Sequence, residues 1–233
     1  MLRSRFAADK RKSRRMRVTK HKSASVSKVA GDSAKTDLRA LRTGKRIDAA
    51  FVALLHRRGY GNIRVSDITR KADVGRATFY AHYSSKNELL RAQFNRIVVP
   101  MLAIRASTSC PLDASALFGH VQSARQIYKS LMGPHAGEGA RVLQECFERR
   151  VEEALAARGE GPGVKWGSTD EVRVILARFV ASTLLAVVEC FVETGAGESP
   201  KEMQRIFGTL VGGGLAAFEG GVAGKSGEGT EFV

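Results

Sequence analysis

The side chains best suited to chemistry lie in the stretch Ala72–Leu90, ADVGRATFYAHYSSKNELL. Its polar groups combine guanidinium, hydroxyl, imidazole and ammonium functions within a few helical turns: Arg76, Thr78, Tyr80, His82 and Lys86. Such groups donate hydrogen bonds to phosphate oxygens, and an arginine can also donate two bonds to the O6 and N7 atoms of guanine. The combination predicts a surface that reads a nucleic acid.

Each of these side chains has an expected role at a DNA surface. Arg76 falls in the first turn of its predicted helix, where a recognition helix meets base edges, and Ala77 is suited to a thymine methyl group. Hydroxyl and imidazole tips are suited to phosphate oxygens, although a lone tyrosine or histidine also fits an ordinary protein surface. The complete set of predicted DNA contacts is Arg64, Ser66, Gly75, Arg76, Ala77, Thr78, Tyr80, His82 and Lys86.

Three short helices are predicted to position these groups. Apolar residues recur at helical spacing over 37–58, a second helix covers Val65–Ala72, and a third covers Arg76–Tyr83. The three-residue break over 73–75 is typical of a helix-turn-helix, which places its second helix in the major groove of DNA. The side chains expected in its core are Ile68, Val74, Phe79 and Tyr83.

The stretch DITRKADVGRATFYAHYSSKNELL closely resembles the signature of the tetracycline-repressor (TetR/AcrR) family of transcriptional regulators. Family members read approximately D-I-A-x-x-A-G-V-S-x-x-T-[LF]-Y-x-H-F-x-[SD]-K-x-x-L-[LF]. The matching positions in this chain are Asp67, Ile68, Ala72, Val74, Thr78, Phe79, Tyr80, His82, Ser85, Lys86, Leu89 and Leu90. The resemblance covers about residues 40–95 and implies an amino-terminal DNA-binding domain.

Three positions depart from that signature. Arg64 stands where the family usually has a Thr or Ser that caps the second helix, so a cap is lost or replaced and a cation is gained. Asp73 replaces the usual turn glycine and is expected to adopt a left-handed or bridging conformation, which Asp tolerates better than most residues. Gly75 replaces the usual Ser cap of the third helix, which is a mild change.

The remaining chain predicts helices only, so the fold class is all-α. A capping box at Ser85 and Glu88 begins the next helix, and Pro100 should kink or end it. Further helices are expected over about 113–132, 138–158, 168–193 and 199–218. The predicted organisation is a disordered basic arm over 1–36, a helix-turn-helix domain over 37–84, a helical ligand-binding and dimerisation domain over 85–220, and a flexible tail over 221–233.

The resemblance implies that the second domain dimerises through its last two helices and holds a small-molecule pocket, whose inducer releases the operator. Val172–Val192 is apolar on more than one face, as a helix covered by its own domain and by a partner must be. We therefore expect a homodimer through about residues 169–218. Gly208 and the glycines over 212–214 would allow close approach of the backbones there, although the three consecutive glycines would alternatively break the helix. Pocket candidates, each of which also fits a plain core, are Phe94, Met101, Tyr128, Phe147 and Phe179.

The positive charge is concentrated at the amino terminus. The formal net charge is +15, and residues 1–35 hold twelve Lys and Arg against two Asp. Such a segment is attracted to polyanions, nucleic acid first and anionic membrane second. The alternatives are a merely solubilising tail, and an architectural protein that uses the arm to bind all DNA sequences alike. We expect double-stranded DNA as the partner and no membrane.

Other functional classes have little support. Cys110, Cys146 and Cys190 form no CxxC or CxxH pair, so neither a metal site nor a disulfide framework is expected. No nucleophile, zinc-protease or phosphate-loop motif is found, and we expect no enzyme activity, no catalytic residue and no cofactor besides the effector. No apolar run reaches the ~20 residues of a membrane span. The prediction is a cytoplasmic, nucleoid-associated bacterial protein.

Overall fold

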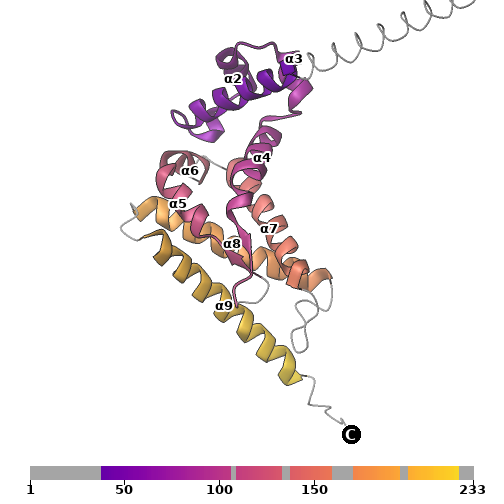
Figure 1. Cartoon of the computed structure of the whole chain (residues 1–233), viewed down its shortest axis with the longest axis vertical. Helices are drawn as coiled ribbons and strands as arrows, with labels where there is room; N and C mark the ends of the chain where they lie inside the picture. Colours follow the sequence, from indigo (N-terminus) through magenta and orange to yellow (C-terminus); the bar gives the residue numbers. More distant parts are fainter. Residues whose placement is uncertain (1–37, 106–108, 133–136, 159–169, 195–198, 226–233) are drawn as a thin grey trace, which may run out of the picture. The chain divides into compact units, whose positions relative to one another are not determined.

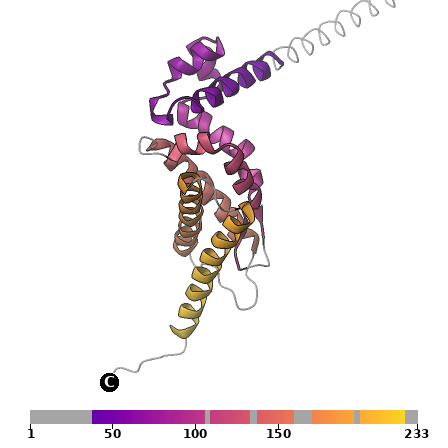
Figure 2. The same cartoon turned by 90° about the vertical axis from the view of Figure 1, so that its left-hand side faces the viewer.

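The computed structural model describes residues 38–105, 109–132, 137–158, 170–194 and 199–225 (Figures 1 and 2). The predicted basic arm over 1–36 lies outside these residues, as do residues 226–233 of the predicted tail. The chain divides into two compact units, residues 1–47 and 48–233. Residues 38–47 of the first unit are helical.

In the second unit, one helix end and three short elements form the helix-turn-helix. Residues 48–55 are helical and are followed by η1 (Tyr60–Asn62), α2 (Val65–Ala72) and α3 (Arg76–His82). We call η1, α2 and α3 the reading head. The predicted helices around the turn over 73–75 are therefore confirmed.

The reading head is held together by a small apolar core. Ile68 of α2 and Phe79 of α3 are completely buried, as predicted, and the two helices pack against each other. Val74 and Tyr83, which were predicted to lie in the same core, are only partly buried. The other large apolar and aromatic side chains buried in this part of the chain are Phe51, Leu54, Leu55, Tyr60 and Ile63.

Helix α4 (Lys86–Ile97) follows the reading head. The Ser85 hydroxyl accepts a hydrogen bond from the Glu88 N–H at 3.1 Å, which confirms the predicted cap. The reciprocal half of the predicted capping box is wrong, because the Glu88 carboxylate accepts from the N–H and hydroxyl of Ser84 instead. Pro100 lies after the end of α4, within η2 (Val99–Met101), as its missing N–H requires.

The single helix predicted over about 113–132 is wrong. The structure has α5 (Ser115–Ser123) and α6 (Arg125–Met132), and Ala124 between them departs from helical geometry with φ −112° and ψ 26°. The Ser123 hydroxyl donates to the His120 carbonyl at 2.9 Å. A serine that bonds its own backbone in this way competes with the helical ladder and favours a break.

A pair of short strands, each of two residues, precedes α5. Strand β1 (Ala103–Ile104) pairs antiparallel with β2 (Leu112–Asp113), with Ala103 opposite Asp113. The prediction that the chain contains no strands is therefore wrong here. It failed because two-residue strands are too short to show an alternating pattern in the sequence. The all-α class is unaffected.

Three long helices complete the unit: α7 (Glu138–Arg158), α8 (Asp170–Thr194) and α9 (Pro200–Lys225). Helix α7 packs against α4 and α8, and α9 packs against α5 and α8. Aromatic side chains fill the space among α5, α8 and α9, where Phe118 contacts Phe191 and Phe207 edge-on. Figure 1 shows α7, α8 and α9 in the orange to yellow part of the chain.

Helix α9 runs past the end predicted at about Phe218 and reaches Lys225, so residues 221–225 of the predicted tail are helical. Its glycines do not break it. A Cβ atom on Gly212 would lie 2.9 Å from the Ser109 hydroxyl, and one on Gly214 would lie 2.6 Å from the Phe179 ring. At both positions the missing side chain lets another segment lie close to the α9 backbone, as the close-approach alternative predicted.

Helix α8 is the one helix in the described part of the chain that is long and apolar enough to cross a bilayer, with a mean hydropathy of 2.0 and 44% burial in its most apolar window. A core helix of a soluble protein passes the same test. One face of α8 is buried in this way, with its apolar row against the neighbouring helices: Leu176, Val180, Leu184, Val188 and Phe191.

Candidate nucleic-acid interface

Helix α3 turns one side inward and the other outward. Phe79 is completely buried, whereas Tyr80 beside it is 55% exposed. The remaining side chains of the outward face are also exposed: Arg76, Ala77, Thr78 and Ala81. The predicted base-reading and phosphate-contacting groups of α3 are therefore exposed, except for His82 at its end, which is half-buried.

The turn before α3 sets its direction. Asp73 adopts the left-handed conformation, with φ 51° and ψ 55°, and is the one non-glycine residue with positive φ in the described ranges. Its N–H donates to the Arg70 carbonyl at 3.3 Å, and the Val74 N–H donates to the Thr69 carbonyl at 3.0 Å. The conformation expected of Asp73 is therefore confirmed. Gly75 follows in an extended conformation and caps α3 without a side-chain hydrogen bond.

The departure from the signature at Arg64 is compensated by a side chain of α2. The Arg64 N–H donates to the Asp67 carboxylate at 3.0 Å, so the helix start is satisfied although residue 64 has no accepting side chain. Asp67 also lies 3.7 Å from the guanidinium groups of Arg58 and Arg70. The Arg64 side chain is exposed beside half-buried Ser66, which leaves this cation available to a phosphate.

The carboxyl end of α3 is tied to two other helices through Asp48. The Tyr83 hydroxyl donates to one oxygen of this carboxylate at 2.8 Å, and the Arg96 guanidinium donates to the other at 2.7 Å. Burial and the bond to Asp48 raise the pKa of Tyr83 to about 12. The hydroxyl is therefore protonated at neutral pH and serves as a permanent donor that holds α3 in place.

Lys86 lies elsewhere than its predicted role suggests. Its ammonium donates to the Tyr60 carbonyl at 3.0 Å and sits 4.1 Å from the centre of the Tyr60 ring. Burial lowers the pKa of Lys86, although Glu138 opposes this shift. An ammonium has three N–H donors, so a contact with phosphate stays a prediction that the remaining donors would have to fulfil.

Comparison with known proteins agrees with this geometry. Residues 47–92 match the sequence profile of the bacterial regulatory proteins of the tetR family. These residues form a domain of the tetR family, which we call the tetR-family domain. The match begins in the helix before η1 and ends within α4, so it contains the complete reading head.

A curated relative supports the same assignment for the amino-terminal part. The uncharacterized HTH-type transcriptional regulator YxbF of Bacillus subtilis (strain 168) is 38% identical over 80 residues, which are 34% of this chain and 21% of YxbF. The match therefore spans only about a fifth of that relative's length.

Solved structures show that the tetR-type fold extends beyond this domain. A TetR transcriptional regulator from Streptococcus agalactiae 2603V aligns over 77% of this chain and 98% of its own, with a TM-score of 0.53 and 21% identity. The fatty acid degradation regulator FadR from Bacillus halodurans aligns over 73% and 98%, with a TM-score of 0.52 and 18% identity. At these identities the likeness concerns the fold alone.

The pocket candidates beyond the tetR-family domain do not all come together. Phe94 of α4 and Phe147 of α7 are buried in edge-on contact, with their ring centres 5.5 Å apart. Tyr128 is buried on α6, and Met101 is half-buried in η2. Phe179 lies apart, since it is 39% exposed on α8 and its ring faces Gly214 of α9.

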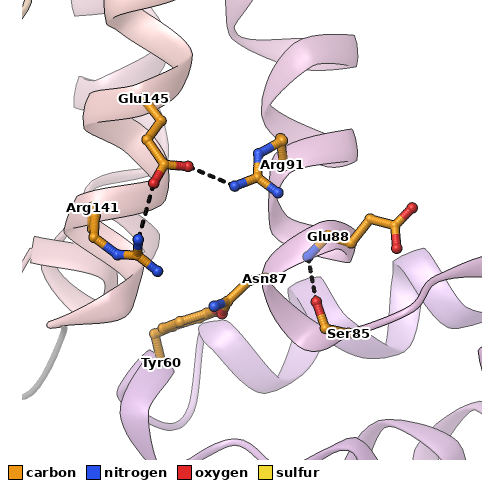
Figure 3. Close-up of polar contacts among 7 residues, drawn as sticks. All are labelled: Tyr60, Ser85, Asn87, Glu88, Arg91, Arg141 and Glu145. Atoms are coloured by element: carbon orange, nitrogen blue, oxygen red, sulfur yellow. Dashed lines mark hydrogen bonds and ion pairs between the residues drawn. The ribbon is translucent and has the colours of Figure 1, made fainter.

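Sequence reasoning missed the polar contacts that join the reading head to α4, and α4 to α7. Figure 3 shows Tyr60 of η1 beside Asn87 of α4, and Arg91 of α4 joined to Glu145 of α7. The two contacts measure 2.5 Å between the Tyr60 hydroxyl and the Asn87 side-chain oxygen, and 2.6 Å between Arg91 and Glu145. Their partners are 27 and 54 residues apart in the chain, so no local pattern indicates them.

Among the described residues, no group of three or more His, Cys, Asp or Glu side chains is placed to hold a metal ion. Cys110 and Cys146 are buried and Cys190 is exposed, and none of the three forms a disulfide bond.

Proposed function

We propose that the protein is a repressor that binds a palindromic operator as a homodimer and leaves it when a small molecule binds the helical domain. The observation that carries the proposal is the outward face of α3, where Arg76, Thr78 and Tyr80 are exposed while Phe79 anchors the helix from behind. A helix anchored in this way offers its polar side to the major groove. The protein would act in the bacterial cytoplasm, on the nucleoid.

Base reading is assigned to Arg76, the first residue of α3. A bidentate bond from its guanidinium to guanine would supply about 1–3 kcal/mol of discrimination against a wrong base. Thr78 and Tyr80 are assigned to phosphate oxygens, which set the position of the helix without selecting a sequence. The exposed cations of α2, Arg70 and Lys71, add to the positive surface beside them.

The homodimer is proposed from the apolar surface that α8 and α9 leave exposed. Ile175 and Val174 are 63% and 48% exposed on α8, and Leu210 is 52% exposed on α9. A Cβ atom on Gly213 would meet nothing within 4 Å, so a second helix has room to approach there. Two copies joined at this surface would present two recognition helices to successive turns of DNA, about 34 Å apart.

Two buried polar groups support a ligand within the helical domain. In the described part of the chain, the Tyr128 hydroxyl and the Gln93 side-chain nitrogen are buried without a hydrogen-bond partner. A buried polar group in that state costs about 1–3 kcal/mol, so a ligand with acceptor atoms would remove that cost. Burial raises the pKa of Tyr128, and its hydroxyl is therefore a donor at neutral pH. We propose an effector with an apolar body and at least one acceptor oxygen.

Selection from a random pool of duplexes, followed by footprinting, tests the proposal. The full-length protein should enrich one inverted repeat whose halves are centred about one helical turn, or a multiple of it, apart. Sedimentation of the complex should give two chains for each repeat. A chain that enriches no sequence would contradict the proposal.

The architectural alternative is separated by the same experiment. A protein that binds through the basic arm alone would retain random duplex as strongly as the enriched repeat, with steep weakening as salt rises. Mapping the occupied genomic sites would then identify the controlled genes, and transcription from them in a deletion strain should rise if the protein is a repressor.

A further inference from the structure

Tyr60 occupies a position where three helices meet, although η1 that carries it has only three residues. The side chain is completely buried. Phe51 of the preceding helix contacts its ring edge-on, and the Lys86 ammonium of α4 lies over its face. The ring is therefore fixed from two sides by elements of the tetR-family domain.

On another side the ring meets α7, beyond the tetR-family domain. A Cβ atom on Gly139 would lie 2.9 Å from Cδ1 of Tyr60 and 3.2 Å from its Cγ. Real Cβ atoms essentially never come within 3.0 Å of a neighbour, so only glycine leaves room for the ring here. The Tyr60 ring of the reading head thus packs directly against the backbone of α7 at Gly139, in the first turn of that helix.

One face of α4 contacts both Tyr60 and α7. The Asn87 side-chain oxygen accepts a hydrogen bond from the Tyr60 hydroxyl at 2.5 Å, and one turn further along, Arg91 pairs with Glu145 of α7 at 2.6 Å (Figure 3). Glu145 is in turn bonded to Arg141 of α7 at 3.2 Å. Helix α4 therefore contacts Tyr60 and α7 at successive turns. If α7 is displaced along α4, either one of these contacts breaks or Tyr60 moves together with α7.

We propose that Tyr60 is a positioning residue that couples the reading head to α7 through Gly139, a path that does not depend on bending of α4. Only Ile63 and Arg64 separate η1 from α2, so a movement of Tyr60 is passed directly to the helices that meet DNA. The arrangement seen here, with the ring seated against Gly139, is the one that binds DNA. This inference rests on the proposed function, and it adds how α7 is connected to that function.

Thermodynamic reciprocity gives the inference a direct test. If the position of α7 changes DNA affinity, then DNA must stabilise the seated arrangement of α7 by the same factor. The probe is the duplex that the wild-type protein selects, and the readout is hydrogen exchange of the peptides covering 138–146. We expect DNA to slow their exchange in the wild-type protein, although these residues belong to no predicted DNA contact.

Gly139→Ala is the decisive variant, because its added methyl group displaces the Tyr60 ring. We expect its DNA affinity to fall about tenfold, within the 5- to 150-fold range of typical couplings, and the protection of 138–146 by DNA to disappear. Gly119→Ala on α5 is the matched control, since a Cβ atom there meets nothing within 4 Å. It should bind DNA and protect α7 as the wild-type protein does.

A second variant covers the case in which Gly139→Ala does not fold. Tyr60→Leu removes the ring from the Gly139 side while keeping an apolar residue, and it should also abolish the protection of 138–146. Wild-type behaviour in whichever of these variants folds would overturn the inference and leave the proposed function standing. A wild-type protein that selects no duplex would contradict the proposed function itself, and the inference with it.

Discussion

Replacing Tyr83 by Phe removes one hydroxyl group from the contact that ties α3 to the rest of the unit. That hydroxyl donates to the Asp48 carboxylate at 2.8 Å, and Asp48 is 9% exposed. Hydrogen bonds to charged groups contribute about 1.5–3 kcal/mol. Because the Tyr83 side chain is only half-buried and Arg96 still pairs with Asp48, we expect the lower end, a loss of about 1.5 kcal/mol in the free energy of unfolding.

The matched control is Tyr80→Phe, which removes the same hydroxyl from the exposed side of the same helix. Surface changes of this kind stay within about 0.5 kcal/mol. Urea denaturation at equal protein concentration measures both variants against the wild-type protein. Equal losses of stability in the two variants would refute the argument that the Asp48 contact anchors α3.

The pKa of Tyr83 adds a signature in the pH dependence. Its folded pKa of about 12 lies above the ordinary value of 10.0. The unfolded chain therefore releases this proton first, so the associated stability is complete below pH 10 and is lost as the pH rises toward 12. The stability difference between the wild-type protein and Tyr83→Phe should shrink over this interval. A difference that stays constant from pH 8 to pH 12 would contradict the role of the protonated hydroxyl.

Three further outcomes are expected. Asp73 has φ 51°, so Asp73→Gly should stabilise the fold and Asp73→Ala should destabilise it, each by about 1 kcal/mol in thermal unfolding; opposite signs would contradict the strain. Ile175→Asp should sediment as a monomer, whereas Leu41→Asp, with 56% against 63% exposure, should remain dimeric; a dimeric Ile175→Asp would move the interface elsewhere. Deleting residues 1–35 removes twelve cations and should flatten the dependence of DNA affinity on salt; an unchanged slope would mean that the arm does not touch DNA.

The reading head could be predicted from the sequence because local rules decide it. The spacing of Ile68 and Phe79, the break over 73–75 and the tolerance of Asp73 for the left-handed region all lie within about a dozen residues. The cap at Ser85 followed from the same kind of short-range chemistry. Only its reciprocal bond differed, because Glu88 reached the neighbouring Ser84 instead.

The features that could not be predicted depend on contacts between distant segments. Gly139 resembles any other helical glycine until the Tyr60 ring is placed against it, 79 positions earlier in the numbering. Lys86 matches a phosphate-binding position in the signature, yet its ammonium is engaged by the Tyr60 carbonyl. The break at Ala124 was hidden because α5 and α6 continue one apolar pattern across it, with Val121, Tyr128 and Leu131 all buried.

The most direct test of the account is selection of binding sites by the wild-type protein and by Arg76→Ala from the same random duplex pool. If α3 reads the major groove, the wild-type protein should enrich an inverted repeat, and the variant should enrich the same repeat with the preference relaxed at one symmetric pair of base pairs, by about 10- to 100-fold. An identical preference at every position in both proteins would show that Arg76 does not read a base. Failure of the wild-type protein to enrich any repeat would contradict sequence-specific recognition by α3 altogether.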